Sequence, residues 1–179
     1  MSIEPFWVEV NEPAIRQGDY LPRCLVPWPV FDPTTFAENN EIQDVNVEVR
    51  ELDLIILTQS CDLENKKVRL VTLSPIYSLT EFERINPAFT KKGKWEEVRR
   101  GRLEALYLLA SPIDPGNNRD ALVVDFGEIY SLPYEYVEKY ATKLGQRWRL
   151  KSPFLEHFSQ AFARCFMRVG LPSAIPPFK

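Results

Sequence analysis

The sequence is short of the residue types that most often bind metals. It contains one histidine and three cysteines among 179 residues. Cys24, Cys61 and Cys165 are odd in number and widely spaced, which argues against a disulfide framework and favours a reducing compartment. Structural zinc ligands usually come in close pairs, and the chain has no glycine-rich phosphate loop. We therefore expect neither a metal nor a cofactor.

The sequence also lacks long apolar runs. No run approaches the roughly 18 residues that suggest a membrane span, and MSIEPFWVEV at the beginning has no basic and apolar regions of a signal peptide. We therefore expect a cytoplasmic protein without a membrane partner. The length and the apolar share predict one globular domain over residues 1–179.

Lysine is absent from residues 1–65. That part carries thirteen Asp or Glu and three Arg, a balance of −10 (3 − 13), so the remainder must carry +7 to give the net charge of −3. Residues 89–102 have six basic and two acidic side chains, and residues 143–151 have four basic and none acidic. Such clusters could bind phosphates or an acidic protein. Alternatively, they are solvated faces that lie opposite the acidic first part of the chain.

Apolar periodicity predicts a protein built mainly of β-strands. Residues 52–59 (LDLIILTQ) are nearly all apolar, so we expect a strand buried on both faces. Residues 44–50 place Val45, Val47 and Val49 on one face, the pattern of a half-buried strand. Prolines restrict residues 22–33 to an edge strand or a loop. Further strands are predicted over residues 6–10, 68–76, 104–111 and 121–132.

Helical signals gather in the last third of the chain. Proline near the start and glycine near the end mark helices over residues 131–145 and 152–172. Residues 78–102 are polar, basic and partly helical, an insertion between strands. The predicted fold class is mainly β, of the α+β type. It has a β-rich small barrel over residues 1–132, with the insertion, and a C-terminal helical pair over residues 133–172.

The last predicted helix carries a possible anion site beside its apolar face. On a helical wheel, His157, Arg164 and Arg168 lie within about 40° of each other. One imidazole and two guanidinium groups could hold a phosphate or a carboxylate. Boundary arginines also often bury only their stems and reach water. The apolar stripe itself consists of Phe154, Leu155, Phe158, Phe162, Cys165, Phe166 and Val169.

A polar segment, QSCD, follows the strand predicted at residues 52–59. If Cys61 is a nucleophile it needs a base, because the thiolate is the reactive form. His157 is the one histidine, so it would have to be that base, oriented by Asp62 or Glu156. Gln59 and Ser60 would then line the same site. The alternative is that Cys61 is a packing residue, as most unpaired cysteines are.

Two tryptophans lie beside basic residues. Trp95 follows Lys94, and Trp148 stands between Arg147 and Arg149. Aromatic rings with cationic neighbours can stack on nucleic-acid bases. Tryptophan beside arginine also commonly covers the edge of a core.

Three segments together resemble the MazF and PemK family of plasmid-maintenance toxins. They are QGDYL, VRELDLIILTQSCDLENKKVRLVTLSPI and ALVVDFGEIYSLP. The resemblance covers about half the chain and implies a small SH3-like barrel with metal-independent endoribonuclease activity. The family's arginine would correspond to Arg50 and its hydroxyl residue to Thr72 or Ser74. Leu52 and Asp53 occupy the place of the family's arginine–proline pair.

These observations leave three hypotheses for function. The first is a divergent bacterial member of this superfamily, of the toxin or phage-defence type, that binds RNA, another nucleic acid or a protein partner. Its site would combine Gln59, Ser60, Cys61 and Asp62 with His157, Arg164 and Arg168. The second is an active endoribonuclease that uses Arg50 with Thr72 or Ser74. The third is a thiol hydrolase that uses Cys61 and His157. The oligomeric state remains open.

Overall fold

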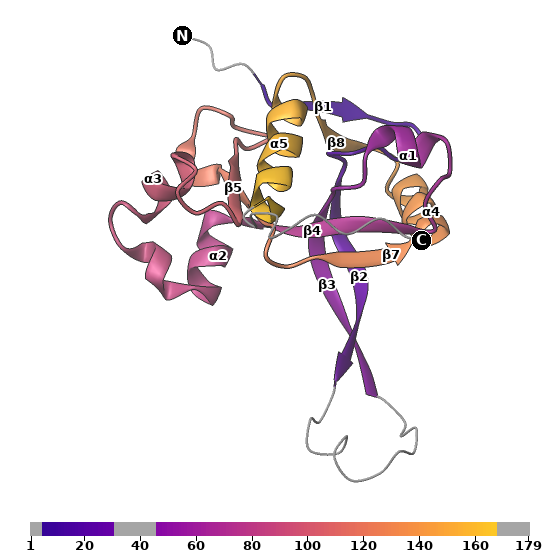
Figure 1. The fold of residues 1–179 in the computed structure, drawn as a ribbon, viewed down its shortest axis with the longest axis horizontal. Helices are drawn as coiled ribbons and strands as arrows, with labels where there is room; N and C mark the ends of the chain where they lie inside the picture. Colours follow the sequence, from indigo (N-terminus) through magenta and orange to yellow (C-terminus); the bar gives the residue numbers. More distant parts are fainter. Residues whose placement is uncertain (1–4, 31–45, 168–179) are drawn as a thin grey trace, which may run out of the picture.

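The computed structural model describes residues 5–30 and 46–167, which form a mixed α+β fold (Figure 1). The strands are β1 (Trp7–Val10), β2 (Tyr20–Val30), β3 (Asn46–Ile56), β4 (Leu70–Ser78), β5 (Leu106–Leu109), β6 (Leu122–Asp125), β7 (Tyr130–Pro133) and β8 (Arg147–Leu150). The α-helices are α1 (Ser60–Glu64), α2 (Leu79–Ile85), α3 (Lys94–Arg99), α4 (Tyr134–Leu144) and α5 (Phe154–Phe166). Two 3-10 helices are η2 (Pro87–Thr90) and η3 (Asn118–Asp120).

Strand β4 is the centre of a six-stranded antiparallel sheet. It pairs with β3 on one edge and with β7 and then β6 on the other, while β2 and β5 lie outermost. Strands β1 and β8 form a separate two-stranded ribbon. Among the described strands the pairings form an open path and do not close into a barrel.

Strand β3 divides the interior into two cores. Leu54 and Ile56 pack in the first core, whereas Ile55 packs in the second. Leu57, directly after the strand, also packs in the second core. All four side chains are at most 2% exposed. The prediction of a strand buried on both faces is therefore confirmed, and the physical reason is the alternation of side chains between two covered faces.

Different elements cover the two cores. Helix α4 covers the first core with Val137 and Ala141, and α5 covers the second with Phe158. The two predicted C-terminal helices are present and pack on the sheet, but strand β8, which the sequence analysis did not predict, lies between them in the chain and pairs with β1. The alternation of charged and apolar residues in RWRL, from Arg147 to Leu150, is the strand signal that the basic composition concealed.

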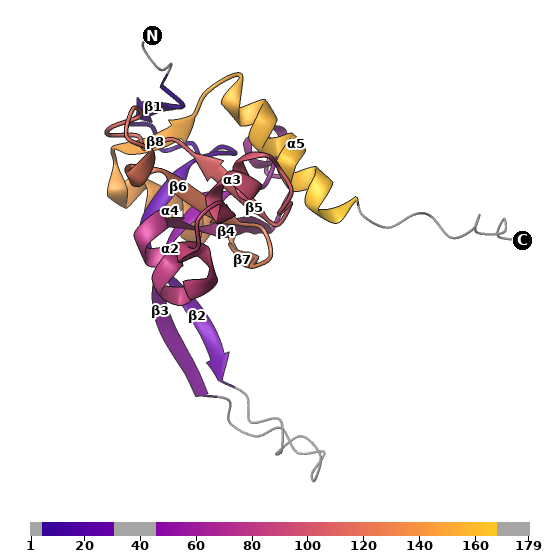
Figure 2. The same cartoon turned by 90° about the vertical axis from the view of Figure 1, so that its left-hand side faces the viewer.

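Strands β2 and β3 extend from the body as an arm, which Figures 1 and 2 both show. The edge-strand prediction for β2 is confirmed. The half-buried prediction for residues 44–50 is wrong, because Val47 and Val49 are 57% and 65% exposed. Their cross-strand partners are Pro29 and Pro27, on the same exposed face of the arm. Val45 lies outside the described residues.

A turn divides the strand that the sequence predicts over residues 121–132. Strands β6 and β7 both pair with β4, and the residues between them leave the ladder. There the Asp125 carboxylate accepts a hydrogen bond from the Gly127 amide at 2.8 Å, and Phe126 turns into the second core. Aspartate and glycine favour such a turn because the carboxylate substitutes for a backbone acceptor.

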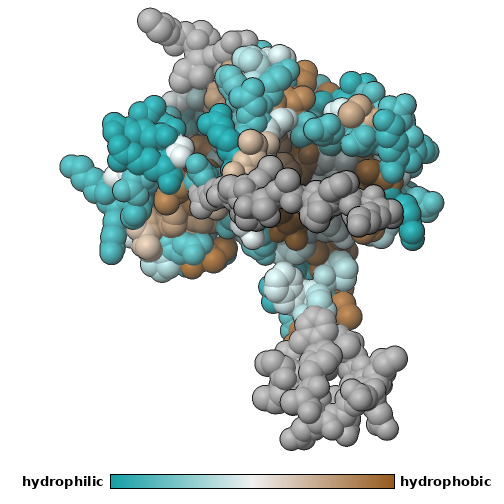
Figure 3. Space-filling model, in the orientation of Figure 1, coloured by the Kyte–Doolittle hydropathy of each residue, from teal (hydrophilic) through white to brown (hydrophobic). Residues whose placement is uncertain are grey.

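The insertion at residues 78–102 is partly helical, as predicted. Helices α2, η2 and α3 surround the rings of Phe82, Phe89 and Trp95, whose centroids lie 5.0 to 5.7 Å apart. The indole nitrogen of Trp95 donates a hydrogen bond of 2.7 Å to Glu83. Trp95 therefore stabilises the insertion, and hydrophilic residues gather over α3 (Figure 3).

The apolar stripe of α5 packs against the second core along most of the helix. Phe158 is fully buried, and Leu155, Phe162 and Cys165 pack against the second core. Phe166 is 57% exposed, so the predicted stripe fails in the last turn, where the helix passes the end of the core. Val169 lies outside the described residues. Within residues 5–30 and 46–167, no helix is long and apolar enough to cross a bilayer.

Candidate functional site

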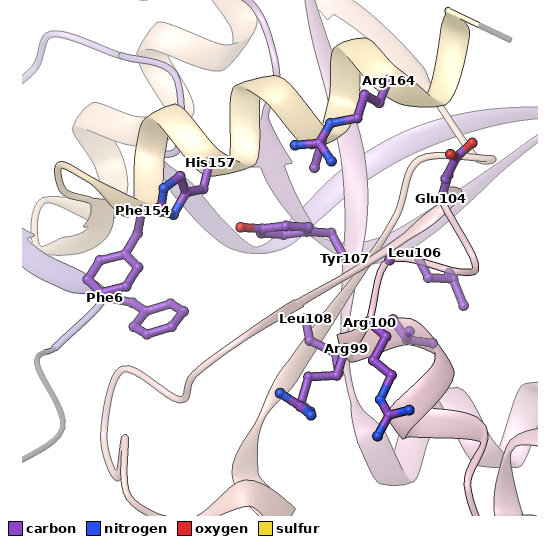
Figure 4. Close-up of a pocket in the computed structure, with 13 residues that line it drawn as sticks. Phe6, Arg99, Arg100, Glu104, Leu106, Tyr107, Leu108, Phe154, His157 and Arg164 are labelled. Carbon is purple, nitrogen blue, oxygen red and sulfur yellow. The ribbon is translucent and has the colours of Figure 1, made fainter.

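A groove of about 430 Å³ runs between α5 and the insertion (Figure 4). One wall is the face of α5 that carries His157, Ala161 and Arg164. The opposite wall is formed by residues 98–101, at the end of α3, and by residues 106–108 of β5. The groove therefore joins two parts of the chain that the sequence marks separately as basic or cationic.

Helical geometry places His157 and Arg164 on the same wall. They are seven residues apart, which is about two turns or 10.5 Å along the axis. Phe158, beside His157, is buried in the second core and so fixes the rotation of the helix. The side chains of His157 and Arg164 then both lie at the rim, as the helical wheel predicts. Arg168, the third member of the predicted row, lies outside the described residues.

The opposite wall carries Arg99 and Arg100, both paired with Glu96. The closest nitrogen–oxygen distances are 2.6 Å from Arg99 and 2.7 Å from Arg100. These two guanidinium groups lower the pKa of the Glu96 carboxyl to about 2. All three side chains are exposed to water, where such pairs contribute little to stability. The two arginines can therefore exchange Glu96 for another anion at small cost.

The charge of the groove is positive on balance. Arg99, Arg100 and Arg164 line it together with the carboxylate of Glu104. Counting Glu96 as well, the formal sum is +1 (3 − 2) with His157 neutral. Within the described residues, the guanidinium of Arg164 makes no salt bridge. The chemistry of the groove therefore suits an anion held between the two walls.

Aromatic rings line the same groove. The rings of Phe6 and Phe154 stack with centroids 3.8 Å apart and an interplanar angle of 14°. Tyr107 projects between the walls in Figure 4, and its ring packs on Phe126 and Phe158. Burial raises the pKa of the Tyr107 phenol, and the nearby Arg164 opposes that shift. Sequence reasoning missed these rings, since a single aromatic residue in a strand carries no signal of its own.

The polar segment QSCD leads into helix α1, which begins at Ser60. Gln59 precedes the helix, and Ser60 accepts a hydrogen bond of 3.2 Å from the Gln17 amide. Cys61 is exposed, with its sulfur 3.7 Å from the Gln59 side-chain oxygen and 3.9 Å from the Asp62 carboxylate. Asp62 also lies 4.0 Å from the Lys67 ammonium. Ser60 therefore anchors the start of α1 to the Gln17 backbone, while the Cys61 thiol lies at the surface.

The structure places Cys61 and His157 on different sides of α5. The Ser159 hydroxyl donates a hydrogen bond of 3.0 Å to the side-chain oxygen of Gln17. The backbone amide of Gln17 in turn donates to the Ser60 hydroxyl. The α1 segment therefore lies on the Ser159 side of the helix. His157 is two residues earlier, about 200° around the helix, and lines the groove instead. The described contacts do not bring this thiol and imidazole together.

Arg50, Thr72 and Ser74 do not converge either. The guanidinium of Arg50 lies 3.9 Å from the ring centroid of Trp28, on the arm. The Thr72 amide donates to the Thr58 hydroxyl at 2.7 Å, at the other end of the β3–β4 pairing. Ser74 is fully buried and donates to the Asp125 carbonyl at 2.5 Å. Each residue has a structural partner in a different place.

A buried ion-pair network is the polar feature that sequence reasoning missed. Asp19, fully buried, accepts hydrogen bonds from Arg147 at 2.9 Å and from Arg149. Both arginines also donate to the Ala14 carbonyl, and Arg149 pairs with Glu12. The basic residues at 147 and 149 thus face the acidic first part of the chain, the alternative that the charge pattern left open. They are not available to a ligand.

In the part of the chain that the structure describes, no three or more His, Cys, Asp or Glu side chains lie close enough together to hold a metal ion. Comparison of the chain with protein-family models, with characterised proteins and with solved structures finds no match.

Proposed function

We propose that the protein binds single-stranded nucleic acid, with RNA as the first candidate, in the groove between α5 and the insertion. The observation that carries this proposal is the meeting of Arg164 and His157 on one wall with Arg99 and Arg100 on the other. A phosphate chain carries negative charge at regular intervals, and arginines bind phosphate oxygens with paired N–H donors. Arginines on both walls of one groove suit such a chain better than a single anion.

The aromatic residues of the groove support the same ligand. Single-stranded nucleic acids are bound by cationic grooves whose aromatic side chains stack on the bases. Here Tyr107 and the Phe6–Phe154 stack line the groove beside the arginines. A duplex would hide its bases from these rings, so the proposal is for an unpaired strand.

We place the protein as a divergent bacterial, cytoplasmic member of the MazF and PemK-like superfamily, of the toxin or phage-defence type. The backbone around Gly18 supports this reading, because its amide donates to Ile56 at the end of β3 and so fixes the QGDYL turn to the sheet. The order β3, α1, β4 and then β7 leading into α4 also follows the resemblance. The open sheet would then be a divergent form of the SH3-like barrel.

We attribute binding to the groove and no catalytic step. The endoribonuclease alternative needs Arg50 beside Thr72 or Ser74, and the thiol-hydrolase alternative needs Cys61 beside His157. Neither arrangement receives support from the contacts described above. An acidic protein is the competing ligand for the groove, and the experiment below separates it from nucleic acid.

The test is fluorescence anisotropy of a labelled single-stranded RNA titrated with protein over a range of salt concentrations. We expect Arg164→Gln to weaken binding about tenfold at low salt, the size expected for one charge-assisted phosphate contact. The slope of log affinity against log salt should become shallower by about 0.7 for each phosphate that the protein no longer neutralises. Arg99→Gln should act in the same direction.

Arg119→Gln is the matched control, because Arg119 is exposed on η3 and outside the groove. It removes the same charge and should leave the affinity within about twofold, since distant surface charges are screened. Equal losses of affinity in Arg164→Gln and Arg119→Gln would show that RNA binds through the overall charge of the protein and not through contacts in the groove. No RNA binding by the unmodified protein would overturn the proposal and leave the acidic protein as the ligand to test.

A further inference from the structure

We infer that a second, smaller pocket at the β1–β8 ribbon binds a guanidinium group. This pocket of about 270 Å³ is lined by Glu9, Tyr20, Pro22, Gln146, Arg147 and Trp148. None of these residues lines the groove described above. The inference is independent of the proposed nucleic-acid binding.

The strand register places a carboxylate beside an indole ring. Glu9 and Trp148 are directly opposite each other in the β1–β8 pairing, so both side chains leave the same face of the ribbon. Opposed side chains have Cβ atoms about 4.5 to 5.5 Å apart. Glu9 is exposed and Trp148 is half-buried against the second core. A cation over the indole would therefore lie within reach of the Glu9 carboxylate.

Tyr20 adds a second ring to the pocket. Its hydroxyl donates a hydrogen bond to the Asp53 carboxylate. The same carboxylate accepts a bond of 2.8 Å from the Arg23 amide, which holds it in place. Burial and this carboxylate keep the phenol neutral by raising its pKa. The pocket thus offers two aromatic rings and the carboxylate of Glu9, while Asp53 fixes the Tyr20 hydroxyl from outside the pocket lining.

The one cationic residue of the pocket does not oppose this charge. Arg147 leaves the ribbon on the face opposite to Trp148, because neighbouring strand residues alternate. Its guanidinium is fully buried and binds Asp19 and the carbonyls of Glu12 and Ala14. Arg147 therefore contributes only its backbone and stem to the wall. An anionic ligand would find no available donor of positive charge there.

A guanidinium group matches these walls better than other cations. Its flat face stacks on aromatic rings, and its paired N–H donors fit one carboxylate. The neutral amide of Gln146 can accept or donate at the rim. The source of the group is either an arginine side chain of a protein partner or a free guanidino compound.

The test follows the indole N–H resonance of Trp148 in ¹⁵N-labelled protein during titration. The probes are N-acetyl-arginine amide, its uncharged citrulline counterpart, and a short peptide with one arginine between glycines. We expect saturable shifts with the arginine probe at about millimolar affinity, since a single cation–π contact and one ion pair supply only weak binding. Citrulline should produce no saturable shift. A peptide that binds at least tenfold more tightly than the amide would identify a protein partner, and equal affinities a free guanidino compound.

Glu9→Gln is the decisive variant, because it removes the charge and keeps the size of an exposed side chain. We expect it to weaken the arginine probe about tenfold, whereas Glu48→Gln on the exposed arm should leave the affinity unchanged. Equal responses to arginine and citrulline, or equal affinities in the two variants, would overturn the inference. RNA titrated alone should not move the Trp148 resonance, which separates this pocket from the groove.

Discussion

The guanidinium of Arg147 lies 2.9 Å from the carboxylate of Asp19, and both side chains are fully buried although 128 residues separate them in the chain. Arg149 binds the same carboxylate from the same strand. Asp19 binds both arginines of β8, with Glu12 as the second carboxylate partner of Arg149, and so holds the turn before β2 against the β1–β8 ribbon. A buried charge without its partner is costly, so this contact gives the first prediction.

Asp19→Asn should lower the free energy of unfolding by about 3–5 kcal/mol, because the buried guanidinium of Arg147 loses its carboxylate and Arg149 retains only Glu12. Urea unfolding followed by tryptophan fluorescence measures this change. Asp114→Asn is the control, since Asp114 is exposed in a turn and its replacement should cost less than about 0.5 kcal/mol. Similar midpoints for both variants would show that the network contributes little.

The three thiols should differ in reactivity according to exposure. Cys61 is exposed, whereas Cys24 is fully buried and burial raises its thiol pKa. A thiol-specific chromophoric reagent should therefore modify Cys61 first in the folded protein, and Cys24 only after denaturation. The replacement Cys61→Ser should remove the fast phase.

His157→Ala serves as the control for the thiol-hydrolase alternative. Because His157 lines the groove on the other side of α5, this replacement should leave the rate of Cys61 modification unchanged. A slower rate in His157→Ala, restored at high pH, would mean that the imidazole activates the thiol and would return the thiol hydrolase to first place.

Stability should fall sharply in alkali. Burial is the largest cause that raises the pKa of every one of the seven tyrosines, to about 12 at Tyr136. An unfolded tyrosine ionises near 10. The folded state therefore keeps its phenols protonated where the unfolded chain loses protons. This contribution to stability is fully present below pH about 10 and is lost as the pH rises towards 12.

The measurement for this prediction is the phenolate absorbance and the urea midpoint as functions of pH. The folded protein should show little phenolate at pH values where the urea-unfolded protein shows most of its signal. Tyr136→Phe should remove one phenolate equivalent from the late part of the titration. Superimposable titrations of the folded and unfolded protein would contradict the assignment of buried phenols.

Glu104→Gln tests the electrostatics of the groove. Glu104 lines the groove with Arg164, and removing its charge should tighten single-stranded RNA binding about fivefold at low salt, because a like charge near phosphate is removed. The gain should disappear at high salt. Glu135→Gln provides the control, because Glu135 is exposed on α4. Weaker binding in Glu104→Gln would instead assign the carboxylate a direct contact with the ligand.

The sequence predicts those parts of the fold whose signals are local. The continuous run around Ile55 predicts a strand buried on both faces, and the proline–glycine signals predict α4 and most of α5. The burial of Val47 and Val49 is predicted wrongly, because an alternating apolar pattern shows which residues share a face of a strand. It does not show whether another layer covers that face. Strand β8 is missed because the basic residues of RWRL conceal its short alternating pattern, and its partner β1 is distant in the chain.

The candidate site shows the same division. The helical wheel correctly sets His157 and Arg164 side by side, since both lie on one helix. It cannot bring Arg99 and Arg100 to them, because their meeting depends on how the insertion packs on β5. The roles of Tyr107 and of the Asp19 network depend on tertiary contacts in the same way.

The β1–β8 ribbon has a consequence for how the protein is made. Trp7 in β1 pairs with Leu150 in β8, and both help to fill the second core. A growing chain therefore presents β1 long before its partner strand exists. Contacts that close such long loops form late and slowly. Until β8 is synthesised, the second core lacks Leu150 and β1 lacks its partner strand, so the incomplete core is open to chaperones and to self-association.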